Sequence, residues 1–193
     1  LYHLIFIVKI KNIMSICIIG NSLSALTLAK ALVNHNITVD VMFNKENLNI
    51  SKTRTIGISK SNTDYLNKDI INIDKLLWKI KKIEIFSDNL MKQKLIDFKK
   101  GHEHIFSIVK NYELYQILEN HLSKNKYFKL KYFNDKNLSF INNYDLIVNC
   151  DSSNAITKKY FSKKLVKNYN SNAYTTIISH KKIVNDTAIQ IFT

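Results

Sequence analysis

Long apolar runs and one helical periodicity alternate along the first part of the chain. Residues 16–19 form an unbroken apolar run that ends at Gly20, and residues 37–43 form a second, largely apolar run. Runs of this kind are typical of parallel strands that are buried on both faces. Between them, apolar residues recur at helical spacing, at Leu23, Leu26, Ala29, Leu32 and Val33. The pattern predicts strands over 15–19 and 37–43 joined by a helix over 22–34, one βαβ unit.

The rest of the chain predicts further strands and two or three helices. Strands are predicted over 54–59, 82–88, 93–99, 104–109, 127–133, 144–151, 174–182 and 187–192. Helices are predicted over 61–69 with Ser61 as N-cap, over 111–124, and over 153–165. The middle helix has one apolar face, formed by Leu114, Ile117, Leu118 and Leu122.

This alternation predicts an α/β fold with a Rossmann-like FAD- or NAD(P)-binding domain and a parallel sheet. We expect strands 15–19, 37–43 and 145–149 to be neighbours in that sheet, with the helix over 22–34 packed on it. The predicted domain covers residues 14–170, with a β excursion over 80–100, and residues 171–193 begin an antiparallel substrate-domain sheet. Residues 1–13 are too short an apolar stretch to span a bilayer. We expect them to be a non-native leader, with Met14 as the true start.

Composition changes this picture little. The chain has 193 residues and a formal net charge of +14. The charge comes almost entirely from scattered lysines, and Arg54 is the single arginine. Because base readout and phosphate clamping favour arginine, we interpret the lysines as a solvated surface and expect no specific nucleic-acid partner. Cys17 and Cys150 lie in apolar runs without metal or redox spacing, which indicates buried free thiols in a reducing, cytoplasmic compartment.

The turn after the first strand carries the candidate chemistry. In a G-x-G-x-x-G turn the glycines make the turn, admit the pyrophosphate and let the helix pack on the strand. Gly20, Ser22 and Ala25 occupy these three positions. The Ser22 hydroxyl can donate to a phosphate, and the helix N-terminus supplies further N–H groups. The predicted phosphate-binding residues are Gly20, Asn21, Ser22, Leu23, Ser24 and Ala25. The alternative is a βαβ unit that keeps this shape without a ligand.

The end of the second strand lacks the acid that binds ribose hydroxyls in such folds. Phe43 or Asn44 stands at the position, and Glu46 follows two residues later. Asn44 is the candidate ribose contact, although an amide binds more weakly than a carboxylate.

Five segments in order resemble the FAD-dependent aromatic-ring hydroxylases, and most closely the branch that acts on ubiquinone precursors. They read IIGNSLSALTLAKAL, TRTIGISKSNTDYL, LLWKIKKIEIFSD, FSIVKNYELYQILENHL and YDLIVNCDSSNAITKKYF. The resemblance covers residues 15–193. It implies that the chain is the N-terminal half of such an enzyme, because the family's later Gly-Asp flavin motif has no counterpart before Thr193.

The resemblance implies a role for several residues. Gly20 to Ala25 would face the FAD pyrophosphate, and Arg54 matches the arginine of the R-x-x-x-L-S motif near the flavin. Asp151 matches the aspartate of the Asp-Gly motif, which supports both the flavin and NAD(P)H. The glycine of that motif is Ser152 here, and Lys158 or Lys159 replaces a downstream arginine. The alternatives are a surface cation for Arg54 and a helix N-cap for Asp151.

The function implied is an FAD-dependent monooxygenase that hydroxylates an aromatic ring, a small prenylated phenol on the route to ubiquinone. NAD(P)H would be the electron donor, no catalytic residue is expected in this half, and peripheral membrane association is left open. The alternatives are another FAD- or NAD(P)-linked oxidoreductase and a non-catalytic basic binding protein. We expect this chain to hold FAD poorly. His102 and His104 lack an evident third metal ligand, so a polar turn is the preferred interpretation.

Overall fold

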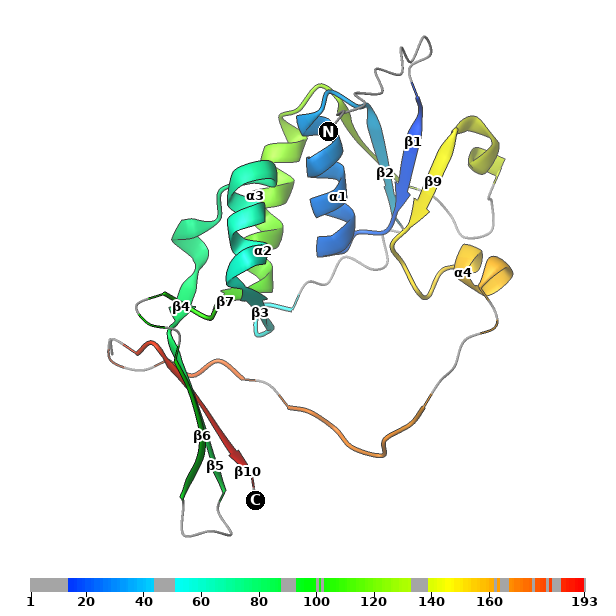
Figure 1. The fold of residues 1–193 in the computed structure, drawn as a ribbon. Coiled ribbons are helices and arrows are strands. Elements are labelled where there is room, and N and C mark those ends of the chain that lie inside the picture. Colours follow the sequence, from blue (N-terminus) through cyan, green and yellow to red (C-terminus); the bar gives the residue numbers. More distant parts are fainter. Residues whose placement is uncertain are drawn as a thin grey trace, which may run out of the picture. The chain divides into compact units, whose positions relative to one another are not determined.

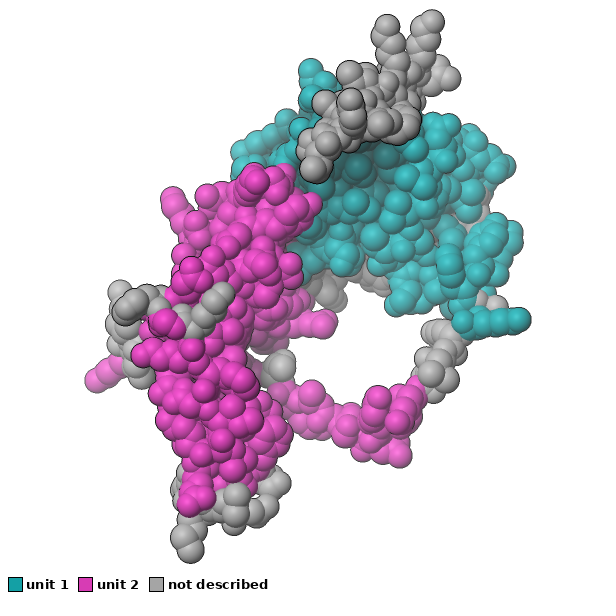
Figure 2. All heavy atoms as spheres, in the orientation of Figure 1, with its two compact units in different colours: residues 1–48, 119–166 teal, residues 49–118, 167–193 magenta. Residues whose placement is uncertain are grey.

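A computed structural model shows the helices and strands of the chain (Figure 1), which form two compact units (Figure 2). Unit 1 comprises residues 1–48 and 119–166, and unit 2 comprises residues 49–118 and 167–193. The residues that the structure describes are 14–43, 51–87, 93–99, 101, 103–132, 139–161, 163, 167–174, 176–179, 181 and 185–192. The expected leader over 1–13 lies outside them, and the expected domain boundaries stay predictions.

Unit 1 is built on a parallel sheet with the strand order β8-β2-β1-β9. The strands are β1 (Ile16–Ile19), β2 (Val39–Phe43), β8 (Phe128–Tyr132) and β9 (Leu146–Asn149). β1 lies between β2 and β9, with Ile16 in register with both Val39 and Leu146. Every residue of β1 and β2 is buried, as their apolar runs predict. The predicted neighbourhood of strands 15–19, 37–43 and 145–149 is confirmed.

Helix α1 (Leu23–Asn34) begins directly after the β1 turn and packs on β1 and β2. Ser22 is its N-cap, with an extended backbone and a side chain that accepts a hydrogen bond from the Ala25 N–H. The buried face of α1 is formed by Ala25, Leu26, Ala29 and Val33. The predicted helix over 22–34 is therefore confirmed to within one residue.

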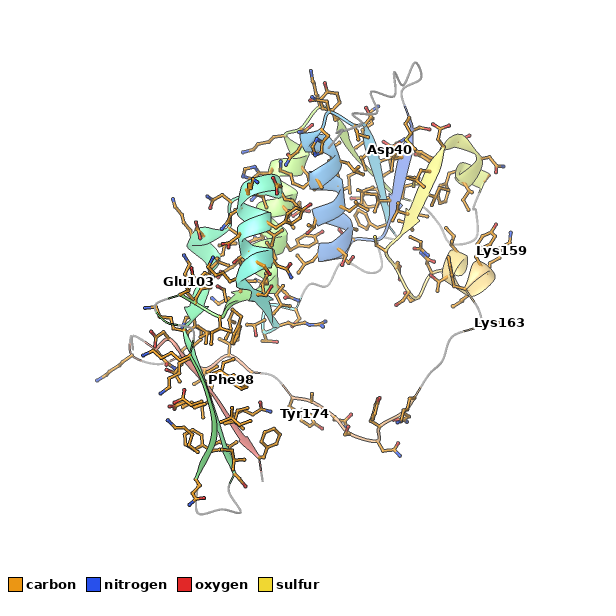
Figure 3. All side chains as sticks on the ribbon, viewed as in Figure 1. Asp40, Phe98, Glu103, Lys159, Lys163 and Tyr174 are labelled. Atoms are coloured by element: carbon orange, nitrogen blue, oxygen red, sulfur yellow. The ribbon has the colours of Figure 1, made fainter. Side chains whose placement is uncertain are left out.

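The sheet face that carries Cys17, Ile19 and Met42 packs on α4 (Ala155–Tyr160) through Ile156, with half-buried side chains from 139–147 around it. One carboxylate, Asp40, sits on this face of β2 (Figure 3). Its Oδ2 accepts hydrogen bonds from Lys131 Nζ and the Tyr144 hydroxyl, both at 2.6 Å. The bond to Asp40 raises the pKa of Lys131, and burial followed by the bond to Asp40 raises the pKa of Tyr144. These two partners compensate the burial of a charge in an otherwise apolar strand.

Unit 2 contains an antiparallel sheet with the order β3-β7-β4. Its strands are β3 (Thr55–Ser59), β4 (Trp78–Ile80) and β7 (Phe106–Lys110). Helix α2 (Lys60–Tyr65) continues as a π-helical turn over Leu66–Ile70, and a 3₁₀ turn covers Asp74–Leu76. Helix α3 (Asn111–Ser123) follows β7 directly and runs from unit 2 into unit 1. Of its predicted apolar face, Leu114, Leu118 and Leu122 are buried and Ile117 is half-buried.

A second sheet of unit 2 has the order β10-β5-β6, formed by β5 (Lys82–Ser87), β6 (Lys94–Lys99) and β10 (Thr187–Phe192). β5 and β6 are antiparallel, whereas β10 joins β5 in parallel. One face carries ion pairs that link Lys82 and Lys94 to Glu84 and Asp97. Large apolar side chains of this sheet are exposed, among them Phe98 at 50% (Figure 3).

Three sequence expectations are corrected. The N-cap of α2 is Ser59 rather than Ser61, because the backbone is still extended at Ser59 and its Oγ accepts from the Asn62 N–H. The described residues within 174–182 have no regular structure, since they pair with no strand among the described residues. The helix predicted over 153–165 is confined to α4, which Asn154 caps. No helix in the described ranges combines the length and apolar character needed to cross a bilayer.

Candidate functional site

Gly20 sits in the turn between β1 and α1 in a conformation that favours glycine. Its φ is +120°, in the left-handed half of backbone space. A Cβ at this position would lie 3.2 Å from the Cys150 carbonyl carbon and 3.3 Å from the Asp151 nitrogen. The segment after β9 approaches so closely because the Cys150 N–H donates to the Ile19 carbonyl at 2.7 Å. Both the backbone angle and the space therefore require the first glycine of the motif.

Ser22, at the second motif position, serves the helix. Its Oγ accepts from the Ala25 N–H at 3.2 Å. This leaves the hydroxyl proton as a possible donor to a ligand, as predicted from the sequence. Ala25, at the third position, lies in the first turn of α1 and is fully buried. Leu23 and Ser24 begin the helix, so no preceding helical turn accepts from their N–H groups.

Asp151 follows β9 and faces the Gly20 turn across a short distance. Its Oδ1 accepts hydrogen bonds from the Ser153 N–H at 2.8 Å and from the Ser153 hydroxyl at 2.7 Å. Asp151 does not cap α4, because Asn154 does so by accepting from the Thr157 N–H at 2.9 Å. The alternative interpretation of Asp151 as a helix N-cap is therefore wrong.

A reciprocal amide pair holds the segment that carries Asp151. Asn149 Nδ2 donates to Asn154 Oδ1 at 3.2 Å, and Asn154 Nδ2 donates to Asn149 Oδ1 at 2.8 Å. The Thr157 hydroxyl donates to the Asp151 carbonyl at 2.7 Å, and the Asp151 N–H donates to Asn149 Oδ1 at 3.1 Å. This network is not predicted from the sequence. Its only local signal is Asn154 three residues before Thr157, the spacing of a helix cap.

Two hollows open at the carboxyl ends of β1 and β9, where parallel sheets place their ligands. The first, of about 260 Å³, is lined by Gly20, Asn21, Ser22, Phe43, Cys150, Asp151 and Ser152. The second, of about 410 Å³, is lined by Ser24, Asn149, Cys150, Asp151, Ser152, Thr157 and Phe161. Unit 1 thus brings together five of the predicted site residues: Gly20, Asn21, Ser22, Ser24 and Asp151.

The β2 side of the first hollow is apolar. Phe43 is 4% exposed, and its ring meets the Tyr132 ring edge-on with centroids 4.9 Å apart. Asn44 and Glu46, the two polar candidates for a ribose contact, lie outside the described residues. Of the two residues predicted at the position of the acid, Phe43 and Asn44, the structure describes only Phe43, which offers an aromatic ring.

Arg54 belongs to unit 2, immediately before β3, whereas Gly20 and Asp151 belong to unit 1. Arg54 is exposed, and its carbonyl accepts from the Asn111 N–H at 3.0 Å. Its place near the flavin stays a prediction, and so does the alternative of a surface cation. Lys158 and Lys159 are exposed in the last turn of α4.

The two thiols differ in their surroundings. Cys17 is fully buried, and this burial, reinforced by the nearby Asp40, raises its pKa to about 12. Cys150 is half-buried, and burial raises its pKa as well. Both are free thiols. Across the described ranges, no three His, Cys, Asp or Glu side chains gather as metal ligands would, and His102 lies outside those ranges.

Comparison with known proteins places the fold. No protein-family model and no curated protein matches the chain. A similar solved structure is PqsL, a probable FAD-dependent monooxygenase from Pseudomonas aeruginosa, with a TM-score of 0.59 and 9% identity over 82% of this chain and 48% of that chain. A proposed FAD-containing monooxygenase from Photorhabdus luminescens gives 0.58 and 19% identity over 77% and 42%. The p-nitrophenol 4-monooxygenase PnpA from Pseudomonas putida gives 0.53 and 12% over 62% and 32%.

At these identities the likeness shows the fold, which is the α/β fold of FAD-binding monooxygenases. The predicted fold class is confirmed, and the resemblance to FAD-dependent aromatic hydroxylases holds at this level. The chain spans about a third to a half of the length of these structures.

Proposed function

We propose that the chain forms the flavin-binding part of a cytoplasmic FAD-dependent monooxygenase that hydroxylates an aromatic ring. Its substrate would be a prenylated phenol on the route to ubiquinone, and NAD(P)H would supply the electrons. The observation that carries the proposal is the Gly20 turn, which lies at the carboxyl edge of the parallel sheet with Asp151 packed against it. This is the place where such sheets bind dinucleotides.

The phosphate side of the hollow fits FAD. Gly20 has no Cβ, the Ser22 hydroxyl can donate, and α1 presents the positive end of its dipole and the N–H groups of Leu23 and Ser24. Asp151 would accept a hydrogen bond from a ribose or ribityl hydroxyl while the amide pair beneath it keeps its backbone in place. Bound flavin would supply the oxygen chemistry of hydroxylation. The residues here would bind and orient it.

The ribose side fits less well, and this supports weak binding by the chain alone. A hydrogen bond to a charged group is worth about 1.5–3 kcal/mol, and each 1.4 kcal/mol is tenfold in affinity. Replacement of the expected acid by Phe43 or Asn44 therefore weakens binding by roughly one to two orders of magnitude. The first hollow, at about 260 Å³, is also smaller than the 300–1,000 Å³ typical of whole-ligand sites, so it would hold part of the dinucleotide.

The test is a titration of the 193-residue chain with FAD, followed by flavin fluorescence, with ADP as competitor. We expect purified protein without stoichiometric flavin, and weak, saturable binding of added FAD that ADP displaces. Asp151→Asn should weaken FAD binding about tenfold, because the amide keeps the Ser153 contacts but loses the charge. The matched control is Asp145→Asn, which removes an exposed aspartate bonded to Ser15 outside both hollows.

Absence of saturable FAD binding, or an equal loss in both aspartate variants, would contradict the proposal. The substrate is tested separately, by incubating a longer monooxygenase that contains this chain with FAD, NADPH and a prenylated phenol and searching by mass spectrometry for one added oxygen atom. Hydroxylation of a simple phenol but not of the prenylated one would restrict the proposal to the monooxygenase class.

A further inference from the structure

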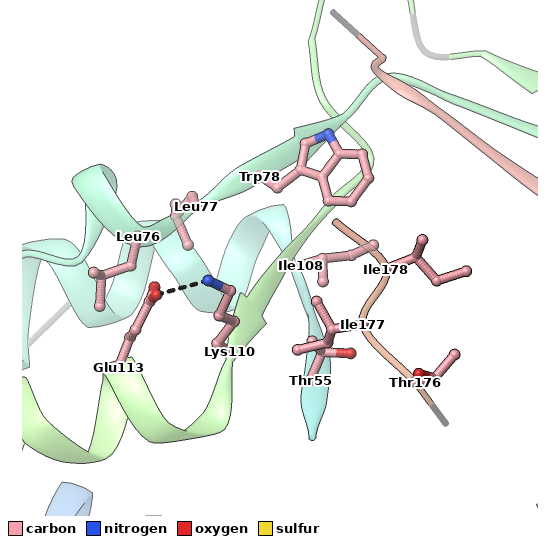
Figure 4. A pocket seen from close by; sticks show the side chains of 10 residues that line it. All are labelled: Thr55, Leu76, Leu77, Trp78, Ile108, Lys110, Glu113, Thr176, Ile177 and Ile178. Carbon is pink, nitrogen blue, oxygen red and sulfur yellow. Dashed lines mark hydrogen bonds and ion pairs between the residues drawn. The ribbon is translucent and has the colours of Figure 1, made fainter. Parts of the chain in front are cut away.

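Unit 2 contains a pocket of about 580 Å³, within the range of small-molecule sites (Figure 4). It lies on one face of the β3-β7-β4 sheet. Trp78 is directly opposite Ile108, and Thr55 is directly opposite Lys110. Since alternate residues of a strand share a face, these two cross-strand pairs form a floor. Gly57, opposite Ile108 on β3, adds no side chain to that face, and the Phe106 ring lies 3.5 Å from where its Cβ would stand.

The walls of the pocket are apolar and include a fixed aromatic ring. Leu76 and Leu77 come from the turn before β4, and Ile177 and Ile178 come from the segment before β10. Trp78 is 48% exposed, yet its indole N–H donates to the Asn185 carbonyl, which holds the ring in one orientation. A half-exposed indole that is already held in place loses little side-chain entropy when a flat molecule stacks on it.

One end of the pocket is polar but has no net charge. Lys110 Nζ lies 3.0 Å from Glu113 Oε1, and both side chains line the pocket (Figure 4). The ammonium has three N–H donors and the carboxylate has two oxygens, so each keeps capacity for a ligand. Because the pair neutralises itself, a ligand carboxylate would gain little there and would lose its hydration against apolar walls.

We propose that this pocket binds a flat, neutral ring system that carries one hydroxyl or carbonyl group. The ring stacks on Trp78 between Ile108 and Ile177, and its oxygen meets the Lys110–Glu113 pair. The proposal concerns unit 2 alone and does not rest on the Gly20 turn or on flavin binding. A chain can therefore fail the FAD titration and still bind such a molecule.

The test uses the single tryptophan of the chain, since its indole N–H gives one resonance in a ¹H–¹⁵N correlation spectrum. The full 193-residue chain is titrated at pH 7 with 2-naphthol, a neutral phenol, and with 2-naphthoate, its charged counterpart. We expect 2-naphthol to shift the Trp78 resonance in a saturable manner. We expect 2-naphthoate to bind at least about tenfold more weakly.

Two variants and a matched control locate the binding. Ile178→Asp should weaken 2-naphthol binding about tenfold or more, and Thr55→Phe should block it by filling the floor. Ile178 is 75% exposed in a segment without regular structure, so neither unit should unfold when it is replaced. Ile189→Asp, at an isoleucine 61% exposed on β10 and outside the pocket, should leave binding within about twofold. Absence of a saturable shift, unchanged binding in both pocket variants, or equal binding of 2-naphthoate would overturn the proposal.

Discussion

The parallel sheet of unit 1 and the β10-β5-β6 sheet of unit 2 differ in how far their strands are buried and in where their charged residues lie. Every residue of β1 and β2 is buried, whereas every residue of β6 is exposed. Within β1 and β2 the single charged residue is Asp40, and Lys131 and Tyr144 both bond to it. In the second sheet, Lys82, Glu84, Lys94 and Asp97 pair at the surface, where ion pairs contribute little. The comparison indicates that the buried strands β1 and β2 contribute more stability per residue than β6 does.

The largest expected effect tests this difference directly. Ile18→Ala, at a side chain with no exposure, should lower the free energy of unfolding by about 3 kcal/mol. Ile189→Ala, at a side chain 61% exposed on β10, should change it by less than about 0.5 kcal/mol. Urea denaturation of both variants checks the prediction. Similar losses at the two positions would show that the exposed sheet is as important for stability as the buried one.

The next effect compares two glycines. Gly20→Ala places a Cβ at a φ of +120° and 3.2 Å from the Cys150 carbonyl carbon, and should cost about 2–3 kcal/mol. Gly57→Ala in β3 meets only the Phe106 ring at 3.5 Å, an ordinary contact, and should change stability by less than about 1 kcal/mol. Thermal unfolding followed by circular dichroism measures both. An equal cost at the two sites would mean that the Gly20 turn relaxes freely.

A third prediction concerns alkaline pH. The Cys17 pKa rises from 9.0 to about 12 on folding, because burial disfavours the thiolate. The free energy of unfolding therefore keeps the contribution of the Cys17 thiol below pH 9 and loses it as the pH rises toward 12. At pH 10.5 the loss is about 2 kcal/mol. The raised pKa values of Tyr144 and Lys131 act in the same direction.

Denaturation curves between pH 8 and pH 11 test the alkaline prediction. Cys17→Ala should flatten the pH dependence, whereas Cys150→Ala, at a half-buried thiol, should leave most of it. An unchanged slope in Cys17→Ala would assign the alkaline loss to other groups.

The smallest predicted effect comes from a comparison of two helix N-caps, Asn154 in unit 1 and Ser59 in unit 2. Asn154 is 3% exposed, and its loss also removes both of its hydrogen bonds with the Asn149 amide, so Asn154→Ala should cost about 1.5–2 kcal/mol. Ser59 caps α2 at an exposed position, and Ser59→Ala should cost about 0.5 kcal/mol. Equilibrium unfolding in urea resolves this difference. A larger cost at Ser59 would contradict the view that burial gives the cap its value.

Much of unit 1 could be predicted from the sequence, because its signals are local and agree with one another. The apolar runs at 15–19 and 37–43 predict buried parallel strands, and Ser22 before the periodic leucines predicts the start of α1. The expectation over 174–182 was wrong for a non-local reason. Alternation makes a strand only where another strand offers hydrogen bonds, and no short window of sequence contains that partner.

The residues of the candidate site also differ in whether a local sequence signal predicts them. Gly20 could be found because a strand, a glycine and a helix follow one another, and the structure gives its φ and its contacts with 150–151 as the physical reason. The Asn149–Asn154 pair could not be found, since two amides five residues apart meet only when the chain turns after β9. The Trp78 pocket also depends on strand register, which pairs Trp78 with Ile108, a residue about thirty positions later in the sequence.

The unequal burial of the two thiols has a practical consequence for labelling the protein. Thiol reagents attack the thiolate and need access to it. Cys17 has no exposed surface and a pKa of about 12, so it should resist alkylation in the folded state. Burial raises the pKa of Cys150 as well, but this thiol is half-buried rather than fully buried, and it lines both hollows at the end of β9. A maleimide dye should therefore attach at a single position beside Gly20, and its emission would report directly on whatever enters there.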